Sequence, residues 1–165
     1  MIVQPIEGPV LRLFYSSLRA EATPRGGWPV HLDSILQVSR TNNAAAHVTG
    51  ALICVENTFL QILEGPVEAV GATFERIACD FRHGDISLLE LGRVERRLFP
   101  EWGMAHLSDE DGVTLELRDD LQDIRLIANT NAREALKRIR LALRAARTGR
   151  RDESSPGRVV VGLRA

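Results

Sequence analysis

The chain has 165 residues, 44% of them hydrophobic, and its formal net charge is −1. This length suits one compact domain with an appendage and is too short for two domains of ordinary size. A nearly neutral chain has no overall attraction to nucleic acid or a membrane surface, and no apolar run approaches the ~18–20 residues that a spanning helix needs. The start, MIVQPIEG, lacks the basic and apolar regions of a secretory signal, so we expect a soluble cytoplasmic protein.

The first predicted strand follows a lead-in that contains two prolines. Its side chains Leu11, Leu13 and Tyr15 recur at every second position, which predicts one buried face. The prolines and glycines of 21–29 predict a loop. Apolar residues at helical spacing then predict a helix over 32–43, which ends at two asparagines.

A predicted hairpin lies at the centre of the chain. Residues 48–55 form a nearly continuous apolar run, which is typical of a strand buried on both faces, and the short turn 56–58 returns the chain into 59–64. Gly65 and Pro66 then begin a second helix, with proline in its first turn. Apolar residues repeat along this helix at spacings of four, three and four, namely at Val70, Phe74, Ile77 and Phe81.

Two further strands are predicted over 86–94 and 105–107. The resulting order, βαββαββ, predicts an α+β fold of the ferredoxin-like kind over residues 10–108, with an antiparallel sheet and two helices on one face. Such a fold by itself does not indicate a function.

The composition changes after residue 108. Residues 109–123 hold seven acidic residues against one arginine, and residues 133–151 hold eight basic residues against one glutamate. Apolar stripes at helical spacing predict a helical hairpin over 109–147 with its turn at 129–131. Residues 148–165 are polar and are predicted to be a disordered tail, except for a short valine run that could pair with a sheet edge.

Gln61 stands where strand alternation places an apolar side chain, on the same face as Phe59 and Leu63. A buried amide without partners costs about 1–3 kcal/mol, so a polar group should lie next to it. Tyr15 is the candidate, because the first and third strands are adjacent in a ferredoxin-like sheet. A purely structural hydrogen bond is the alternative interpretation of this pair.

Asn43 and His83 are predicted near the ends of the two helices, where they could flank a slot for a planar heterocycle. A helix cap and a surface turn residue are the respective alternatives. Trp102 and Met104, on either side of Gly103, could be core or rim packing, which is the more common use of both residue types.

Other chemistries are not indicated. The four histidines have no metal-ligand spacing with each other or with the cysteines, and no nucleophile motif or nucleotide-binding glycine loop is present. Cys54 and Cys79 are expected to be buried free thiols. The basic helix lacks interleaved aromatic residues, so we interpret it as a solvated face or a match to the acidic segment, and nucleic-acid binding is not expected.

Six segments together resemble a known family. They are LRLFYSS at 11–17, SRTNN at 39–43, VTGALIC at 48–54, FLQILEGP at 59–66, DFRH at 80–83 and RLFPEWGM at 97–104. In this order and spacing, over residues 10–108, they resemble the BLUF family of blue-light sensors, which bind a flavin in a ferredoxin-like domain. No single segment is specific, but the ordered set is.

The resemblance implies roles for individual residues. Tyr15 matches the tyrosine that donates an electron and a proton to the excited flavin, Gln61 the glutamine between them, and Asn43 the asparagine that bonds the ring's carbonyl edge. Trp102 and Met104 match a pair in the last strand whose placement carries the signal outward. The remaining positions match residues packed near the ring (Ile35, Leu52) or near its edge or side chain (Ser39, Arg82, His83).

The resemblance also implies a noncovalent cofactor, FAD or alternatively FMN, and no enzymatic activity. The chain is similar to the short BLUF type, whose C-terminal helices cap the other sheet face and which acts on a separate effector protein, and we expect a homo-oligomer, a dimer or larger. Two other classes stay open at this point. One is a small flavin-dependent oxidoreductase, and the other is a ferredoxin-like interaction module without cofactor.

Overall fold

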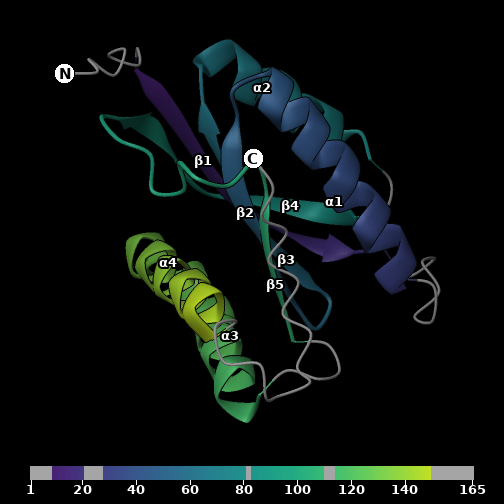
Figure 1. Ribbon diagram of the computed structural model, residues 1–165, viewed down its shortest axis with the longest axis vertical. Helices are drawn as coiled ribbons and strands as arrows, with labels where there is room; N and C mark the ends of the chain where they lie inside the picture. The colour runs from purple at the N-terminus through teal and green to yellow at the C-terminus, as the bar shows by residue number, and fades with distance from the viewer. Residues whose placement is uncertain (1–8, 21–27, 81–82, 110–113, 150–165) are drawn as a thin grey trace.

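The computed structural model describes residues 9–20, 28–80, 83–109 and 114–149 (Figure 1). The elements follow one another as β1 (Val10–Arg19), α1 (Trp28–Ala45), β2 (Thr49–Val55), β3 (Thr58–Gly65), α2 (Val67–Ala78), β4 (His83–Val94), β5 (Ala105–Ser108), α3 (Leu115–Ala128) and α4 (Ala132–Gly149). This order matches the predicted βαββαββ pattern followed by a helical hairpin. In the described part of the chain, no helix is both long enough and apolar enough to cross a membrane.

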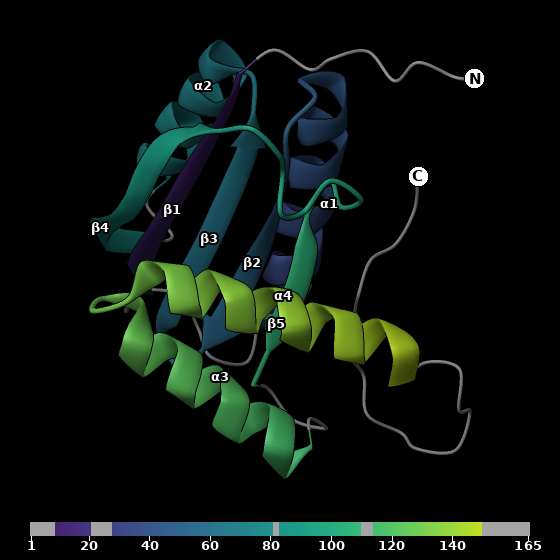
Figure 2. The same cartoon turned by 90° about the vertical axis from the view of Figure 1, so that its left-hand side faces the viewer.

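The five strands form one sheet in the order β4-β1-β3-β2-β5 (Figure 2). The first four strands pair antiparallel, as a ferredoxin-like sheet requires. The prediction of a wholly antiparallel sheet is wrong at one edge, because β5 runs parallel to β2. The chain between β4 and β5 is long enough to cross to that edge, and the sequence pattern does not specify the direction in which it returns.

Helices cover both faces of the sheet. Helices α1 and α2 lie on one face, and α3 and α4 lie on the other (Figures 1 and 2). Because both faces are covered, β2 and β3 are buried along almost their whole length, which explains the nearly continuous apolar sequence of β2. The expectation that the C-terminal hairpin caps the second face agrees with this arrangement.

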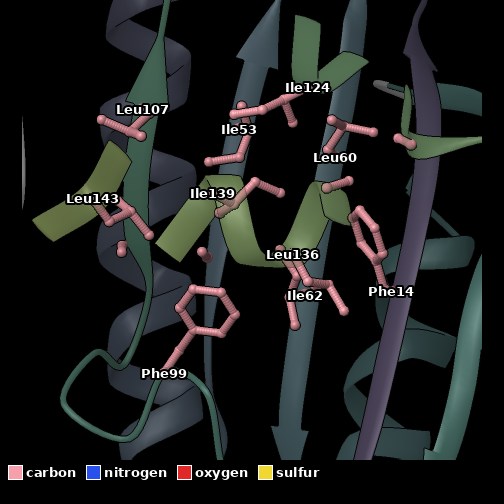
Figure 3. Close-up of a cluster of buried hydrophobic side chains, with 14 of the residues drawn as sticks. Phe14, Ile53, Leu60, Ile62, Phe99, Leu107, Ile124, Leu136, Ile139 and Leu143 are labelled. Carbon is pink, nitrogen blue, oxygen red and sulfur yellow. The ribbon is translucent and has the colours of Figure 1, made fainter. Parts of the chain in front are cut away.

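Two hydrophobic clusters fill the two interfaces. The cluster under α1 and α2 includes Tyr15, Leu36 and Leu63. The other lies between the sheet and the C-terminal helices, where strand residues such as Phe14 and Ile62 meet Leu136 and Ile139 of α4 (Figure 3). The central strands therefore contribute alternate residues to two separate cores.

The C-terminal helices use the predicted apolar stripes. Leu121, Ile124 and Ala128 of α3 are buried, and in α4 the stripe begins with Ala135 and Ile139. Helix α3 begins at an N-cap threonine whose side chain accepts a hydrogen bond from the N–H of Leu117. Helix α4 extends to Gly149, two residues beyond the predicted hairpin, and the predicted tail from residue 150 lies outside the described residues.

Several element boundaries differ from the prediction. Helix α1 begins at Trp28, so Pro29 lies in its first turn, where the missing N–H has no helical acceptor to lose. Pro66 precedes α2 as its N-cap instead of lying inside it. The helix ends at Ala78, and Cys79 is therefore exposed, which corrects the expectation of a buried thiol; Cys54 is buried.

Candidate functional site: a cavity between two helices and the sheet

A cavity of about 260 Å³ opens between α1, α2 and the central strands. Its walls are formed by the strands β1, β2 and β3, by the two helices, and by the segment just before β5. The lining residues are Tyr15, Ser17, Ser34, Ile35, Leu36, Val38, Ser39, Asn42, Asn43, Leu52, Phe59, Gln61, Thr73, Arg76, Ile77, Asp80, His83 and Met104.

Tyr15 and Gln61 form the polar centre of the cavity floor. The two residues are direct cross-strand partners in the β1–β3 pairing, so both side chains leave the sheet on the same face. The Tyr15 hydroxyl donates a hydrogen bond to Oε1 of Gln61. Phe74 of α2 packs edge-on against the Tyr15 ring at a centroid distance of 5.2 Å. Burial raises the pKa of the Tyr15 hydroxyl well above its usual range, so this group is a neutral donor.

The other end of the Gln61 amide faces Met104. Gln61 Nε2 lies 3.8 Å from Met104 Sδ, a contact in which the amide donates to a weak thioether acceptor. The glutamine therefore has one strong partner and one weak partner. A stronger acceptor in the cavity could replace the thioether at little cost.

Helix α1 fastens the segment that carries Met104. Asn43 is buried, and its Nδ2 donates to the carbonyl oxygen of Gly103 at 2.8 Å. Arg40 Nε donates to the carbonyl oxygen of Met104 at 3.1 Å. These two bonds place the thioether next to Gln61. They also show that the Asn43 side chain bonds another segment and does not cap its own helix.

The mouth of the cavity is polar. His83 begins β4, and its Nε2 lies 2.8 Å from the carbonyl oxygen of Ile77, so the end of α2 fixes the imidazole. Arg76 Nη2 lies 3.3 Å from the buried Thr73 hydroxyl. A charged or hydroxylated chain leaving the cavity would meet these groups.

The structure brings eight of the ten predicted site residues together around this cavity. They are Tyr15, Ile35, Ser39, Asn43, Leu52, Gln61, His83 and Met104. Arg82 lies outside the described residues.

Trp102, the tenth predicted site residue, lies on the face of the sheet opposite Met104. It packs into the core beneath α3 and α4, with its ring 6.0 Å from that of Phe99. Both Trp102 and Met104 precede β5, which begins at Ala105, so they are not in the last strand as expected. Within the described part of the chain, the buried indole N–H of Trp102 has no hydrogen-bond acceptor, a cost of about 1–3 kcal/mol in this position.

Some lining residues were not predicted. Ser17 follows Tyr15 by two positions on the same strand face, so alternation could have identified it. Thr73 is a buried polar residue beside the apolar stripe of α2, which is a comparable signal. Asn42 and Arg76 are exposed residues with no such signal, and only the packing of the two helices brings them to the cavity.

The residues present fit a planar heterocycle with polar edges. Ile35 and Leu52 offer apolar surface for the faces of a ring, while the amides of Asn43 and Gln61 offer donors and acceptors for its edge. Among the described residues, no group of three or more histidine, cysteine, aspartate or glutamate side chains is arranged to hold a metal ion. The polar groups of the cavity are amides, hydroxyls and the Tyr15 phenol in its interior, with Arg76, Asp80 and His83 also lining it.

Comparisons with known proteins agree with this geometry. The beta subunit of a photoactivated adenylate cyclase from Euglena gracilis is 34% identical over 80 residues, which is 48% of this chain and 9% of that protein. BlrB, a BLUF protein solved in its dark state, matches with a TM-score of 0.68 and 27% identity over 84% of this chain and 97% of its own. A bacterial light-regulated adenylyl cyclase matches with a TM-score of 0.64 and 27% identity, over 74% of this chain and 35% of that chain.

The chain spans only about 9% of the length of the curated cyclase subunits that it matches. Its match to the family model is much more extensive. The model described as BLUF, sensors of blue-light using FAD, matches residues 10–105, which contain all the cavity residues and the Tyr15–Gln61 pair. The chain therefore belongs to the BLUF family of blue-light flavin sensors.

Proposed function

We propose that this protein is a non-enzymatic photoreceptor that holds FAD noncovalently between α1 and α2 and signals to a separate effector protein. The observation that carries the proposal is the Gln61 amide, which lies between the buried Tyr15 hydroxyl and the Met104 thioether inside the cavity. This amide has a donor end and an acceptor end, so it can exchange partners without leaving its place.

The proposed binding mode follows from the cavity walls. Ile35 and Leu52 hold the faces of the flavin ring, and Asn43 and Gln61 bond its carbonyl edge. Ser39, Arg82 and His83 are the proposed contacts of the ring edge and of the flavin's side chain. A cavity of about 260 Å³ suits the ring system alone, so the remainder of the cofactor extends past the polar mouth. FAD is preferred to FMN because the family model is described by its use of FAD.

The flavin, when bound, supplies blue-light absorption and an excited state that accepts an electron. With flavin bound, Tyr15 would give one electron and its hydroxyl proton to the excited ring and then recover both from it, so the cycle would produce no net oxidation. Between these two steps the hydrogen bond from Tyr15 to Gln61 is interrupted, and the amide rotates or tautomerises. Gln61 afterwards donates to the carbonyl edge of the ring more strongly than before, which lowers the energy of the flavin transition.

In this proposal, the segment from Trp102 to Met104 transmits the light-induced change at Gln61 to the opposite face of the sheet. Rotation of Gln61 removes the donor that faces Met104 Sδ. The same segment carries Trp102 into the core beneath the C-terminal helices, and Glu101 forms an ion pair with Arg147 of α4. A change at the cavity thus has a direct route to the opposite face of the protein.

The C-terminal helices provide the proposed interaction surface. Helix α3 exposes acidic side chains, including Asp119 and Asp120, and helix α4 exposes basic ones, including Lys137 and Arg144. Adjacent surfaces of opposite charge suit both association of the chain with itself, as a dimer or larger oligomer, and docking of a cytoplasmic effector.

The visible absorption spectrum of the purified protein, in the dark, after blue light and during recovery, tests this function. We expect a flavin spectrum that shifts slightly to the red on illumination and returns without bleaching, and FAD as the cofactor released on denaturation. A protein that stays colourless with added flavin would instead indicate the interaction module. Steady turnover with a nicotinamide donor would indicate the oxidoreductase.

A further inference from the structure

Glu64 carries a fully buried carboxylate on β3, three residues after Gln61. The odd spacing sends the two side chains to opposite faces of the sheet, so Glu64 points away from the cavity. A buried charge is strongly unfavourable unless it is paired and hydrogen-bonded, and Glu64 meets both conditions. Its partners lie in β1 and in residues 95–104, which we call the β4–β5 connection.

The carboxylate accepts three hydrogen bonds. Oε1 accepts from Arg12 Nε at 2.7 Å and from the main-chain N–H of Leu98 at 2.9 Å, and Oε2 accepts from the N–H of Phe99 at 2.9 Å. The main-chain oxygen of Glu64 also accepts from Arg97 Nη1 at 3.2 Å. Both the side chain and the backbone of this one residue therefore hold the start of the β4–β5 connection.

The backbone at residues 98 and 99, which Glu64 holds, is linked directly to Trp102. The Trp102 N–H donates to the Phe99 carbonyl oxygen at 3.5 Å, and the two rings are packed together. The Trp102 carbonyl oxygen in turn accepts from the N–H of Gly50 on β2 at 2.9 Å. From Glu64 to Trp102 the connection is fixed at both ends, so it has little freedom to absorb a displacement.

We propose that Glu64 is a positioning residue that couples the β4–β5 connection to β3, so that a change at Gln61 displaces Trp102. The role rests on the proposed photoreceptor function and adds a residue outside the cavity to it. Gln61 acts on the connection at its Met104 end, and Glu64 holds the opposite end of the connection to β3. With that end held, the connection transmits the displacement to Trp102 instead of absorbing it. Without the carboxylate, the photochemistry of Tyr15 and Gln61 continues but Trp102 no longer follows it.

Glu64→Gln is the informative variant, and Glu90→Gln is its matched control. An amide at position 64 keeps the size of the side chain but replaces one acceptor oxygen with a donor, so the N–H of Leu98 or Phe99 loses its acceptor. Glu90 also pairs with Arg12, at 3.7 Å, from the neighbouring strand β4. The control therefore removes a charge beside the same arginine without changing the bonds to Leu98 and Phe99.

The experiment compares flavin-bound wild type with both variants, each also carrying Trp28→Phe so that Trp102 is the single tryptophan. The red shift, the emission of Trp102 in the dark and in blue light, and amide hydrogen exchange at positions 98 and 99 are measured. In Glu64→Gln we expect an unchanged red shift, exchange at least ~10-fold faster, corresponding to about 1.4 kcal/mol, and no light-induced change in Trp102 emission. The wild type and Glu90→Gln should both show that emission change.

If Glu64→Gln behaves like Glu90→Gln in exchange and in emission, Glu64 has no coupling role. The wild type gives an independent test that does not depend on whether the variant folds: if its amides at 98 and 99 exchange as fast as an open loop, the proposed coupling is wrong. A wild type that binds flavin without any red shift would instead overturn the photoreceptor function itself.

Discussion

Tyr15 and Gln61 lie directly opposite each other on β1 and β3, and the Tyr15 hydroxyl donates to the Gln61 amide within the cavity. The strand register alone determines this meeting. A slip of β3 by one residue would turn Gln61 to the opposite face, beneath α3 and α4, while Tyr15 kept its place in the cavity. The site therefore depends on correct pairing of the central strands as much as on the two residues themselves.

The buried hydroxyl predicts how the protein responds to alkaline pH. Tyr15 is the only tyrosine, so tyrosinate absorbance reports this residue alone. Burial raises its pKa in the folded state, whereas the unfolded chain ionises near pH 10. Above about pH 10 the unfolded state therefore binds fewer protons than the folded state, and the free energy of unfolding falls as the pH rises.

An alkaline titration that records tyrosinate absorbance and circular dichroism together checks this prediction. We expect tyrosinate to form only as the secondary structure is lost. Ionisation with a midpoint near pH 10 in a protein that keeps its circular dichroism would contradict the burial of Tyr15.

Gly50 occupies a position in β2 that has no room for a side chain. A Cβ there would lie 1.9 Å from the carbonyl oxygen of Ile62 on the neighbouring strand, and this backbone atom cannot move away without breaking the pairing. Gly50→Ala should lower the free energy of unfolding by about 3 kcal/mol and weaken flavin binding. Gly71 is the control, because it is exposed on α2 with no atom near the position of an added Cβ, and alanine there should stabilise the helix by about 0.5–1 kcal/mol. Equal urea midpoints for the two variants would contradict the close strand packing.

Leu121 tests whether the C-terminal helices are part of the folded domain. Its side chain is fully buried against the sheet face opposite the cavity. Leu121→Ala should cost about 3 kcal/mol in urea unfolding, while the absorption spectrum of bound flavin stays unchanged. Leu126→Ala, at an exposed position of the same helix, should change stability by less than about 0.5 kcal/mol. A Leu121 variant as stable as the Leu126 variant would mean that α3 does not pack on the sheet.

The sequence predicted the part of the site that follows from strand periodicity. Alternation put Tyr15 and Gln61 on inward faces, and the apolar run at 48–55 indicated a strand buried on both faces, paired through a short turn with the strand that carries Gln61. The stripes of α3 and α4 were equally regular. These features are local, because they depend on spacing within one element.

The features that the sequence did not predict depend on a segment without regular secondary structure or on contacts between residues far apart in the sequence. Period-two reasoning fails for Trp102 and Met104, because they precede β5 in an irregular segment that α1 holds through Asn43 and Arg40. The parallel pairing of β5 depends on how that segment crosses the sheet. Glu64 could be recognised as an inward-facing carboxylate from its position in β3, but its partners at 98 and 99 become evident only when the β4–β5 connection folds against it.

The central claim is that the Gln61 amide changes partners on illumination, and Gln61→Leu tests it most directly. Leucine fills the same space without a donor or an acceptor, so flavin should still bind while the light-induced red shift disappears. Gln37→Leu, at an exposed position of α1, is the matched control and should keep the full shift. A light-minus-dark absorption spectrum of Gln61→Leu with a normal red shift would contradict the account, because the shift would then need no amide at position 61.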